Sequence, residues 1–480
     1  MVFSSFTFVF VFLPFVLGLY FVAPRPLKNT VLVVASVFFY AWGAPEFVAL
    51  FLVSTSVDYG LALLLSRYPD GSARRRAVLW SSIVLNTGLL LYFKYANFFV
   101  AQFREVLQWL SVQPPGWENI ALPIGISFFT FHKISYIVDV YRGTSKPARS
   151  FIDYILYISL FPQLIAGPII RYHEIDAQLV GRTVCGSDLY EGMRRFILGL
   201  SRKVLLANPM GAVADNVFQV SPEALTTPYA WIGALAYAFQ IYFDFSGYSD
   251  MAIGLARMFG FRFPENFDRP YVASSFTEFW RRWHMSLSRW MRDYLYVPLG
   301  GNRGGTLLTY RNLWIVFLLS GLWHGANWTF IVWGLYHGLF LVFDRTSLGA
   351  SFARLPYVIK RAITFVLVCF GWVLFRSDTL TGAGRFIQIM LCPWTAGEQA
   401  GTISRSSIIS DYGILVFMVC AVFCVFLETQ RVLSSTRKVV ERCPSTVSDL
   451  VGALLLLSLF VLSMVMIGSG SYSPFIYFQF

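Results

Sequence analysis

The chain has few charged residues and no cysteine pattern of the kind that holds metal ions. Only 13% of its 480 residues are charged and 56% are hydrophobic, whereas soluble domains carry about one quarter charged residues. This composition excludes an ordinary soluble protein and predicts an integral membrane protein whose spans need roughly 20 apolar residues each. The six cysteines are scattered, without CxxC or zinc-type spacing. We therefore expect no bound metal and no bound cofactor.

Two catalytic signatures and the start of a secretion signal are also missing. The sequence has no HExxH motif, which argues against zinc hydrolysis, and no GxSxG motif, which argues against an α/β-hydrolase nucleophile. The first 24 residues contain no Lys or Arg, so the basic region of a cleavable signal peptide is absent. We therefore expect the first apolar run to remain as a span.

Apolar runs recur along the whole chain and are separated by short loops that hold much of the charge. We predict an all-α, polytopic membrane protein that forms a single domain over residues 1–480, with roughly 11 spans plus re-entrant and interfacial helices. The run over 151–170 contains Pro162, Gly167 and Pro168, so we predict a broken or re-entrant segment that protein must cover. The runs lie near 6–23, 30–42, 45–65, 77–93, 119–141, 151–170, 228–245, 313–330, 331–344, 362–376, 412–427 and 450–467.

The basic residues of the loops predict an orientation in the membrane. The loops after the first, third and fifth apolar runs carry nine Lys and Arg residues, whereas the loops between them carry only Lys94 and Arg104. Because basic loops stay on the cytoplasmic side, we expect the N-terminus outside. Four basic residues between 431 and 442 likewise place the final tail, residues 468–480, outside. The net charge of +12 then reflects topology, and we expect no nucleic-acid partner.

The segment FTEFWRRWHMSLSRWMRDYLY, residues 276–296, predicts an amphipathic helix that lies in the membrane interface. Its aromatic and aliphatic side chains share one face, and basic residues including Arg281 and Arg282 share the other. His284 falls at the edge of the apolar stripe. The arginines between 257 and 311 leave two interpretations open: anchoring to anionic lipid headgroups, or a cytosolic docking site for a phosphate-bearing donor.

One histidine stands inside an apolar run, in the stretch GLWHGANW. A span over 313–330 puts His324 eleven residues past its start, which is roughly 16 Å at 1.5 Å per residue and near mid-bilayer. An ionisable side chain at that depth predicts a functional role, and an imidazole can act as a general base toward a hydroxyl. The structural alternative is a histidine whose ring is satisfied by a neighbouring hydroxyl or carbonyl.

Residues near His324 complete a candidate site. Gly321 and Gly325 have the spacing that lets another helix or a ligand approach closely. Trp323 and Asn327 would then line the approach. His337, in the next apolar run, is either a partner of His324 or structural, and the structural interpretation is favoured.

Two further stretches place polar side chains beside apolar runs. In YFDFSGYSDM, Asp244 and Asp250 need partners if they are buried, and Arg257 or Arg262 could supply them. For Asp244 a role in a substrate tunnel or in orienting the histidine, and a structural ion pair at a helix end, stay equally open. In the turn-rich stretch FPENFDRPY, Asn266 either meets a polar ligand or pins its loop.

The C-terminal stretch SYSPFIYFQF is strongly aromatic, and its only charge is the terminal carboxylate. A tail outside the membrane is usually polar, so this one should pack into something. It is either an aromatic plug at the membrane interface or a carrier of a nucleophile, for which Tyr477 is the candidate.

The longest motifs resemble the membrane-bound O-acyltransferase family. They are FPENFDRPYVASSFTEFWRRWHMSLSRWMRDYLYVPLGGNR and SGLWHGANWTFIVWGLYHG, preceded by YFDFSGYSDMAIGLARMFG. The resemblance covers nearly the whole chain. It is strongest to the bacterial branch that includes the membrane subunits for alginate O-acetylation and for teichoic-acid D-alanylation.

This resemblance implies a ring of helices around a thinned membrane centre, with a tunnel that joins the cytosolic and outer faces. It implies that His324 and His284 are the two histidines of the family, and that acetyl-CoA is the donor. It also implies a secreted or membrane-tethered esterase-like partner within a polysaccharide synthesis complex. Tyr477 corresponds to the tyrosine of an aromatic tail motif that is proposed as an acyl way-station in this branch.

We therefore expect an O-acetyltransferase of the bacterial inner membrane that modifies an extracytoplasmic polysaccharide such as alginate or cellulose. His324 would be the general base, and His284 would orient His324 or the donor. The residues expected to line the tunnel or bind substrate are Trp323, Asn327, Asp244, Asn266, Arg281 and Arg282. The alternatives are D-alanyl transfer from a carrier protein, a transporter of an acyl donor, and a structural subunit that anchors a synthase.

Overall fold

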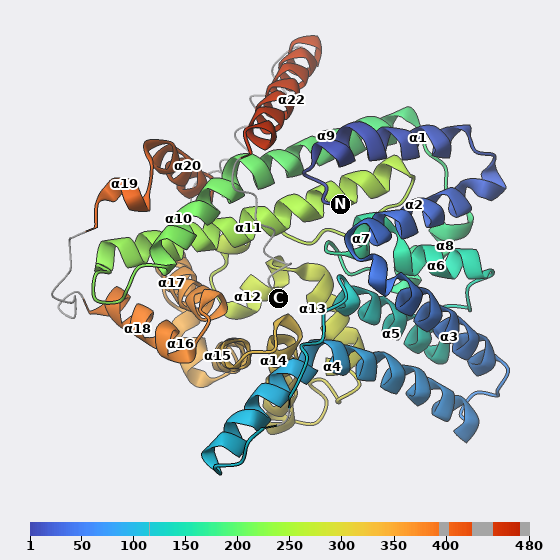
Figure 1. Ribbon diagram of the computed structural model, residues 1–480, viewed down its shortest axis with the longest axis horizontal. Helices are drawn as coiled ribbons and strands as arrows, with labels where there is room; N and C mark the ends of the chain where they lie inside the picture. The colour runs from blue at the N-terminus through green and yellow to red at the C-terminus, as the bar shows by residue number, and fades with distance from the viewer. Residues whose placement is uncertain (115, 393–402, 425–444, 471–480) are drawn as a thin grey trace. The chain divides into compact units, whose positions relative to one another are not determined.

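The computed structural model describes residues 1–114, 116–392, 403–424 and 445–470, and in these ranges it contains helices and no strands (Figure 1). The prediction of an all-α fold is confirmed. The chain divides into two units: residues 1–193, 252–264 and 292–294 form unit 1, and residues 194–251, 265–291 and 295–480 form unit 2. The predicted single domain stays a prediction.

Unit 1 contains the N-terminal helices. It starts with the π-helix η1, Thr7–Phe12, which runs directly into α1. The α-helices that follow are α1 (Leu13–Val22), α2 (Lys28–Gly43), α3 (Val48–Ser66), α4 (Ala73–Trp109), α5 (Ile126–Arg142), α6 (Phe151–Ser159), α7 (Phe161–Leu164) and α8 (Tyr172–Val180).

Unit 2 begins within α9, Gly186–Ser201, and contains most of the later helices. They are η4 (Arg202–Ala207), α10 (Asn208–Phe218), α11 (Thr227–Met258), α12 (Phe276–Arg282), α13 (Met285–Met291), η6 (Arg292–Tyr296), α14 (Thr306–His324), α15 (Trp328–Phe343), α16 (Ser347–Ala353), α17 (Tyr357–Arg376), α18 (Leu380–Leu391), α19 (Arg405–Ile408), α20 (Asp411–Val422) and α22 (Ser445–Gly468). The last residues of α11 and the start of η6 belong to unit 1.

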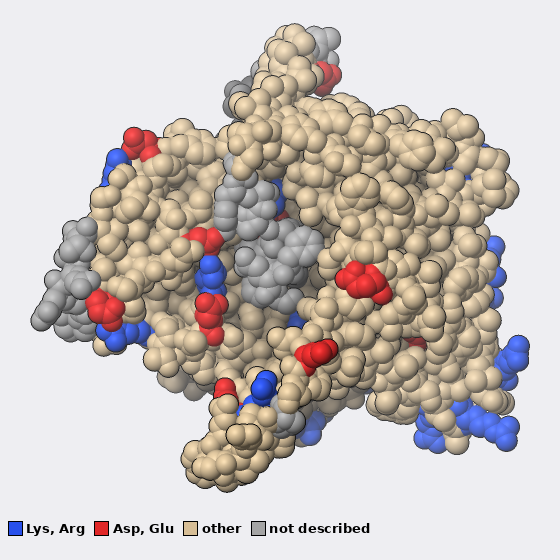
Figure 2. All heavy atoms as spheres, in the orientation of Figure 1, with Lys and Arg blue, Asp and Glu red and all other residues tan. Residues whose placement is uncertain are grey.

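Several helices have the length and composition of membrane spans. Among the described residues four are long and apolar enough to cross a bilayer: Pro45–Ser66, Ala73–Trp109, Tyr357–Arg376 and Val447–Gly468. Shorter apolar helices cover Thr7–Val22, Trp328–Phe343 and Asp411–Val422. The face drawn in Figure 2 carries only scattered charged side chains. The number of spans and the orientation of the termini stay predictions.

The predicted break in the run over 151–170 is confirmed. The helix α6 stops at Ser159, and α7 is a single turn with Pro162 in its first two positions. Every residue over 154–172 is buried, and the hydroxyl of Tyr157 donates to the carbonyl oxygen of Ile170 at 2.9 Å. Protein therefore covers the backbone that the break releases from helical hydrogen bonding, as a segment inside a membrane requires.

A buried ion pair lies within the apolar helices of unit 1. Asp58 of α3 and Lys133 of α5 are buried, and their Oδ2 and Nζ atoms are 3.5 Å apart. From α4, Ser82 and Asn86 donate to Asp58 Oδ1 at 2.7 and 2.8 Å. Lys133 also donates to the hydroxyl of Ser54 at 2.7 Å. One polar network thus ties α3, α4 and α5 together where apolar packing surrounds it.

Removing one partner of this pair should destabilise the protein more than removing both charges. We expect Asp58→Asn or Lys133→Met alone to lower the free energy of unfolding by about 3–5 kcal/mol, because each leaves one buried charge uncompensated. The double variant should recover much of that loss, since the amide that replaces the carboxylate can still accept from Ser82. Thermal unfolding in lipid nanodiscs measures all three variants. A double variant as unstable as the sum of the singles would contradict this account.

Candidate active site

His324 is the last residue of α14, and α15 starts after a turn of three residues. The predicted boundaries of this span are wrong, because the helix begins at Thr306 and ends before the turn. Its 19 residues measure roughly 28 Å at 1.5 Å per residue. His324 therefore lies at the end of a helix and not in its middle. Its depth in the bilayer stays a prediction.

Two glycines allow α14 and α15 to lie side by side (Figure 1). A Cβ atom on Gly321 would lie 2.3 Å from the carbonyl oxygen of Phe330, and one on Gly334 would lie 2.4 Å from that of Phe317. Neither position has room for a side chain. The prediction that Gly321 permits a close helix approach is confirmed, with Gly334 as its partner. Gly325 has a different role, because a Cβ there would lie 2.2 Å from the ring of Phe330.

Asn327 caps the second helix of this hairpin. Its Oδ1 accepts a hydrogen bond from the backbone N–H of Thr329 at 3.1 Å, and its Nδ2 donates to the carbonyl oxygen of Asp378 at 3.0 Å. Its extended backbone is that of an N-cap residue. The amide therefore holds the turn after His324 in place. The predicted contact of Asn327 with substrate stays a prediction.

Aromatic rings enclose the imidazole of His324, which is 8% exposed. The ring centroids of Trp323, Trp333 and Phe375 lie 4.7, 5.0 and 5.1 Å from its own. Trp333 also lies 4.7 Å from the ring of His337. His337 is fully buried and packs in the same aromatic cluster. These surroundings support the structural interpretation of His337, and they make the site of His324 largely apolar.

The predicted continuous helix over 276–296 is wrong. The helix α12 ends at Arg282 and α13 begins at Met285, so the segment is broken at His284, which has a φ of 44°. This left-handed conformation is uncommon outside glycine. The aromatic face does not lie in lipid either, because Phe276 and Phe279 are buried in the hydrophobic core of unit 2. Packing inside the protein outweighs the amphipathic pattern here.

The second histidine, His284, lies near Trp323, the residue that precedes His324. His284 is 1% exposed, and its ring lies 4.6 Å from that of Phe245. Its Nδ1 is 3.1 Å from Oδ1 of Asn266. The ring of Trp323 lies 6.2 Å from His284 and 4.7 Å from His324. The structure thus gathers four of the predicted site residues, with Trp323 in contact with both imidazoles.

Asp244 has a different partner from those predicted. Its Oδ1 lies 2.6 Å from Nζ of Lys203 in η4, and both side chains are buried. The expected partners Arg257 and Arg262 instead pair with Asp188 in unit 1. Sequence analysis missed Lys203, because nothing in the sequence around this lysine indicates that it pairs with Asp244. Lys203 lies on a π-helix, and π-helical turns are frequent at functional sites.

The predicted arginines differ in their surroundings. Arg282 pairs with Glu278 at 2.9 Å and with Asp268 at 3.2 Å, so its guanidinium stabilises the loop before α12. Arg281 is exposed. Asp250 pairs with Arg195 at 2.8 Å and also with Arg202. Of the two predicted donor-binding arginines, Arg281 is the more exposed.

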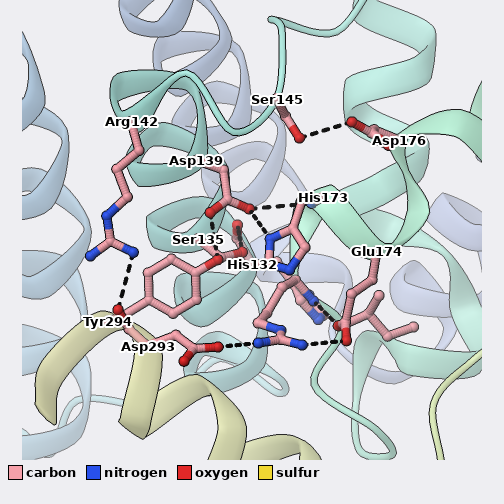
Figure 3. A network of polar contacts seen from close by, with 12 residues as sticks. His132, Ser135, Asp139, Arg142, Ser145, His173, Glu174, Asp176, Asp293 and Tyr294 are labelled. Carbon is pink, nitrogen blue, oxygen red and sulfur yellow. Dashed lines mark hydrogen bonds and ion pairs between the residues drawn. The ribbon is translucent and has the colours of Figure 1, made fainter. Parts of the chain in front are cut away.

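A second polar cluster, which sequence analysis did not identify, lies in unit 1 (Figure 3). Asp139 near the end of α5 accepts hydrogen bonds from His173 Nδ1 at 2.9 Å and from the hydroxyl of Tyr294 at 2.7 Å. Arg171 pairs with the carboxylate of Asp293. These contacts hold residues 292–294, which follow α13 directly, within unit 1. The residues are scattered along the chain, and the sequence gives no sign that they meet.

The aromatic tail, including Tyr477, lies outside the described residues. Its predicted role as an acyl carrier stays a prediction. Within the described ranges, no group of three or more His, Cys, Asp or Glu side chains could hold a metal ion.

Comparison with known proteins bears on the two histidine segments. A profile of the membrane-bound O-acyltransferase family matches residues 145–376, which include both His284 and His324. The chain is also 42% identical over 492 aligned residues to the probable alginate O-acetylase AlgI of Pseudomonas putida, and the match covers 100% of both chains. The protein belongs to the membrane-bound O-acyltransferase family.

Other relatives of this membrane-bound O-acyltransferase carry related names. The probable alginate O-acetylase AlgI of Pseudomonas aeruginosa is 48% identical over 393 residues, which are 81% of this chain and 75% of that protein. The peptidoglycan O-acetyltransferase of Helicobacter pylori is 37% identical over 428 residues, 82% of this chain and 80% of that one. The predicted family is confirmed, and the protein is an integral membrane acyltransferase.

Adding a methyl group to Gly321 should disturb the candidate site around His324. We expect Gly321→Ala to cost about 1–3 kcal/mol of stability, because its Cβ would press on the backbone of α15, and to lower acyl transfer by moving His324. Gly384→Ala on α18 is the matched control, since a Cβ there meets nothing within 4 Å. Thermal unfolding and transfer assays on both variants measure the difference. Equal behaviour of the two variants would contradict the close-packing argument.

The cluster around Asp139 should make stability depend on pH through His173. Its hydrogen bond to Asp139 raises the pKa of His173 above the usual value. A raised pKa stabilises the fold below the unfolded pKa, which is about 6.5, and this stabilisation is lost as pH rises through the folded pKa. We expect His173→Gln to lower the free energy of unfolding by about 1 kcal/mol near pH 5.5 and by less near pH 8.5. An equal loss at both pH values would exclude the charged pair.

Proposed function

We propose that this protein is a membrane-bound O-acetyltransferase that takes acetyl groups from cytosolic acetyl-CoA and passes them to an extracytoplasmic polysaccharide. The observation that carries the proposal is the position of His324. It is the last residue of the first helix in a hairpin of two helices that pack through glycines, and aromatic rings surround it. The chain that holds it matches named O-acetylases over most or all of its length.

In the proposed reaction, His324 acts as a general base. Its imidazole removes the proton of an acceptor hydroxyl, and the oxygen attacks the carbonyl carbon of the acetyl thioester. The carbon–sulfur bond then breaks, and the imidazolium returns the proton to the departing thiolate. The acetyl group leaves as an oxygen ester, and no other reactant is consumed. The aromatic walls exclude water, which would otherwise hydrolyse the thioester.

The neighbouring residues support this step. Trp323 contacts both imidazoles and would separate the donor from bulk water. We propose that His284 orients the donor, because it lies on the segment that carries Arg281. The buried pair of Asp244 and Lys203 would provide a polar wall of fixed charge along the tunnel.

The donor would dock at the cytosolic ends of the arginine-bearing segments. Arg281 is exposed, and a guanidinium suits phosphate oxygens in a fork geometry. Arg282 would shape this face through its pairs with Glu278 and Asp268. The phosphates of acetyl-CoA would bind there while its acetyl end reaches His324.

The acceptor side would face outward. We propose Tyr477 as the first acceptor, because a phenol has a pKa near 10 and forms an ester more reactive than that of an alcohol. An esterase-like partner would then move the acetyl group to the polysaccharide. Alginate is the first candidate polymer, since two of the relatives are named as probable alginate O-acetylases. Both termini would lie outside a bacterial inner membrane.

Transfer of label from acetyl-CoA should depend on His324. We expect the purified protein in nanodiscs to incorporate a radiolabelled acetyl group, and His324→Ala to slow incorporation by at least about 100-fold, the usual range for loss of a general base. His173→Ala is the control, because it removes another imidazole, which is bonded to Asp139 and is not among the predicted site residues. Peptide mapping of the parent then locates the label, which we expect on the peptide that contains Tyr477.

Three results would count against this scheme. If His324→Ala incorporates label as fast as the parent, His324 is not the base. If label appears on other peptides of this protein but not at the C-terminus, Tyr477 is not the acceptor. If only a D-alanyl carrier protein delivers a labelled group, the D-alanyl alternative replaces acetylation.

A further inference from the structure

The side chain of Asn266 contacts His284, the start of α13 and the helix α11. It is buried, with 1% exposure. Its Nδ2 donates to the hydroxyl of Ser249 on α11 at 3.0 Å. Its Oδ1 lies 3.2 Å from the backbone nitrogen of Ser286, 2.8 Å from the hydroxyl of the same residue and 3.1 Å from Nδ1 of His284. The backbone oxygen of Asn266 also accepts from the N–H of Met285 at 2.9 Å.

These bonds explain how a histidine holds a left-handed conformation. The φ of 44° at His284 is costly for a residue with a Cβ atom. The side-chain and backbone oxygens of Asn266 bind three successive residues, 284 to 286, and so over-determine that conformation. A loop that merely needed pinning would not require the contact with the imidazole.

The same contacts assign the proton of His284. A backbone N–H can only donate, so the atom of Asn266 that faces Ser286 must be the amide oxygen. Because that oxygen can only accept, the ring nitrogen that meets it must donate. The proton of the neutral ring therefore lies on Nδ1, and Nε2 carries a lone pair. Within the described part of the chain, Nε2 is buried and has no hydrogen-bond partner.

His337 has the opposite arrangement and serves as an internal reference. The indole N–H of Trp280 points to its Nδ1 at 3.2 Å. An indole nitrogen is a donor only, so Nδ1 of His337 must accept. The proton of this neutral ring therefore lies on Nε2. Two buried histidines of unit 2 thus differ in their tautomers for reasons that the neighbours dictate.

We propose that Asn266 is a positioning residue that holds the proton of His284 on Nδ1, so that Nε2 accepts a hydrogen bond from the acyl donor. The inference rests on the proposed function and assigns a role within it. Nε2 in this tautomer cannot donate to the thioester oxygen. It can bind an N–H group, and the pantetheine arm of acetyl-CoA carries two amides of that kind. Arg281, the exposed arginine proposed to meet the phosphates, precedes His284 by three residues, which places the arm near this ring.

Nitrogen NMR tests the tautomer directly. The protein has five histidines, so full-length protein labelled with ¹⁵N only in histidine gives a simple spectrum in lipid nanodiscs. A ring nitrogen with a proton and one without resonate far apart. We expect the signals lost in His284→Gln to be a protonated Nδ1 and an unprotonated Nε2, with the reverse at His337. Acetyl-CoA should shift the Nε2 signal of His284 toward the protonated range. A protonated Nε2 in the parent, or no shift with acetyl-CoA, would overturn the proposal.

Substitutions separate positioning from simple loop support. We expect Asn266→Ala to give a mixture of the two tautomers at His284 and to lower kcat/KM for acetyl-CoA by about 10- to 100-fold, by analogy with the loss of a residue that orients a metal-bound histidine. Ser249→Ala is the matched control, because it removes the other hydrogen bond of the same amide and leaves the contact with His284. It should keep the tautomer and stay within about threefold of the parent.

The outcomes distinguish this inference from the proposed function. If Asn266→Ala keeps the parent tautomer and activity, or if Ser249→Ala loses as much activity as Asn266→Ala, Asn266 only supports the loop and the inference is wrong. If the parent shows the expected tautomer and binds acetyl-CoA at Nε2 but transfers no acetyl group, the proposed reaction fails while the positioning role holds. If Asn266→Ala does not fold, the parent spectrum and its response to acetyl-CoA still decide.

Discussion

The close contact of Gly321 with Gly334 is the constraint on which the candidate active site depends. It lets α14 and α15 approach until backbone meets backbone, with no room for a Cβ atom on either side. The short turn that follows leaves His324 at the tip of a rigid hairpin, where rings of α15 and α17 close around it. A wider crossing would admit water beside the imidazole, and charge stabilisation in the site would weaken accordingly.

The two histidines reach this region by different means. A helix simply ends at His324, with Asn327 capping the next one. At His284 the helical segment is broken, and hydrogen bonds from Asn266 to His284 and Ser286 hold the strained backbone. Strain of that kind persists only where the surroundings over-determine it, and it gathers at functional sites. His324 thus stands on a rigid support, whereas the ring of His284 is bonded to the amide of Asn266.

Two pairs of oppositely charged side chains are buried inside the units. Asp58 with Lys133 in unit 1, and Asp244 with Lys203 in unit 2, each join helices distant in sequence. In an apolar setting an unpaired charge would be costly, so each pair also fixes which helices can be neighbours. Asp244 of the pair in unit 2 lies on α11 next to Phe245, which packs on His284, so the placement of this pair bears on the site as well as on the fold.

The sequence alone determined the class of the protein and the identity of the central residues. Low charge and long apolar runs were enough to predict an all-α membrane protein. Pro162, Gly167 and Pro168 predicted the break in the run over 151–170. The motifs around His284 and His324 were enough to predict the family. These features are local, so periodicity, composition and motif carry them without knowledge of distant contacts.

Only the tertiary structure decided the partners. Lys203 pairs with Asp244 in place of the predicted arginines, the segment over 276–296 breaks at His284, and its aromatic face enters the protein core in place of lipid. The amphipathic pattern could not reveal this, because a buried aromatic face and a lipid-facing one have the same periodicity. The role of Asn266 was equally out of reach, since it depends on three segments that meet in space. Long-range contacts, with the desolvation and hydrogen bonding they impose, set these choices.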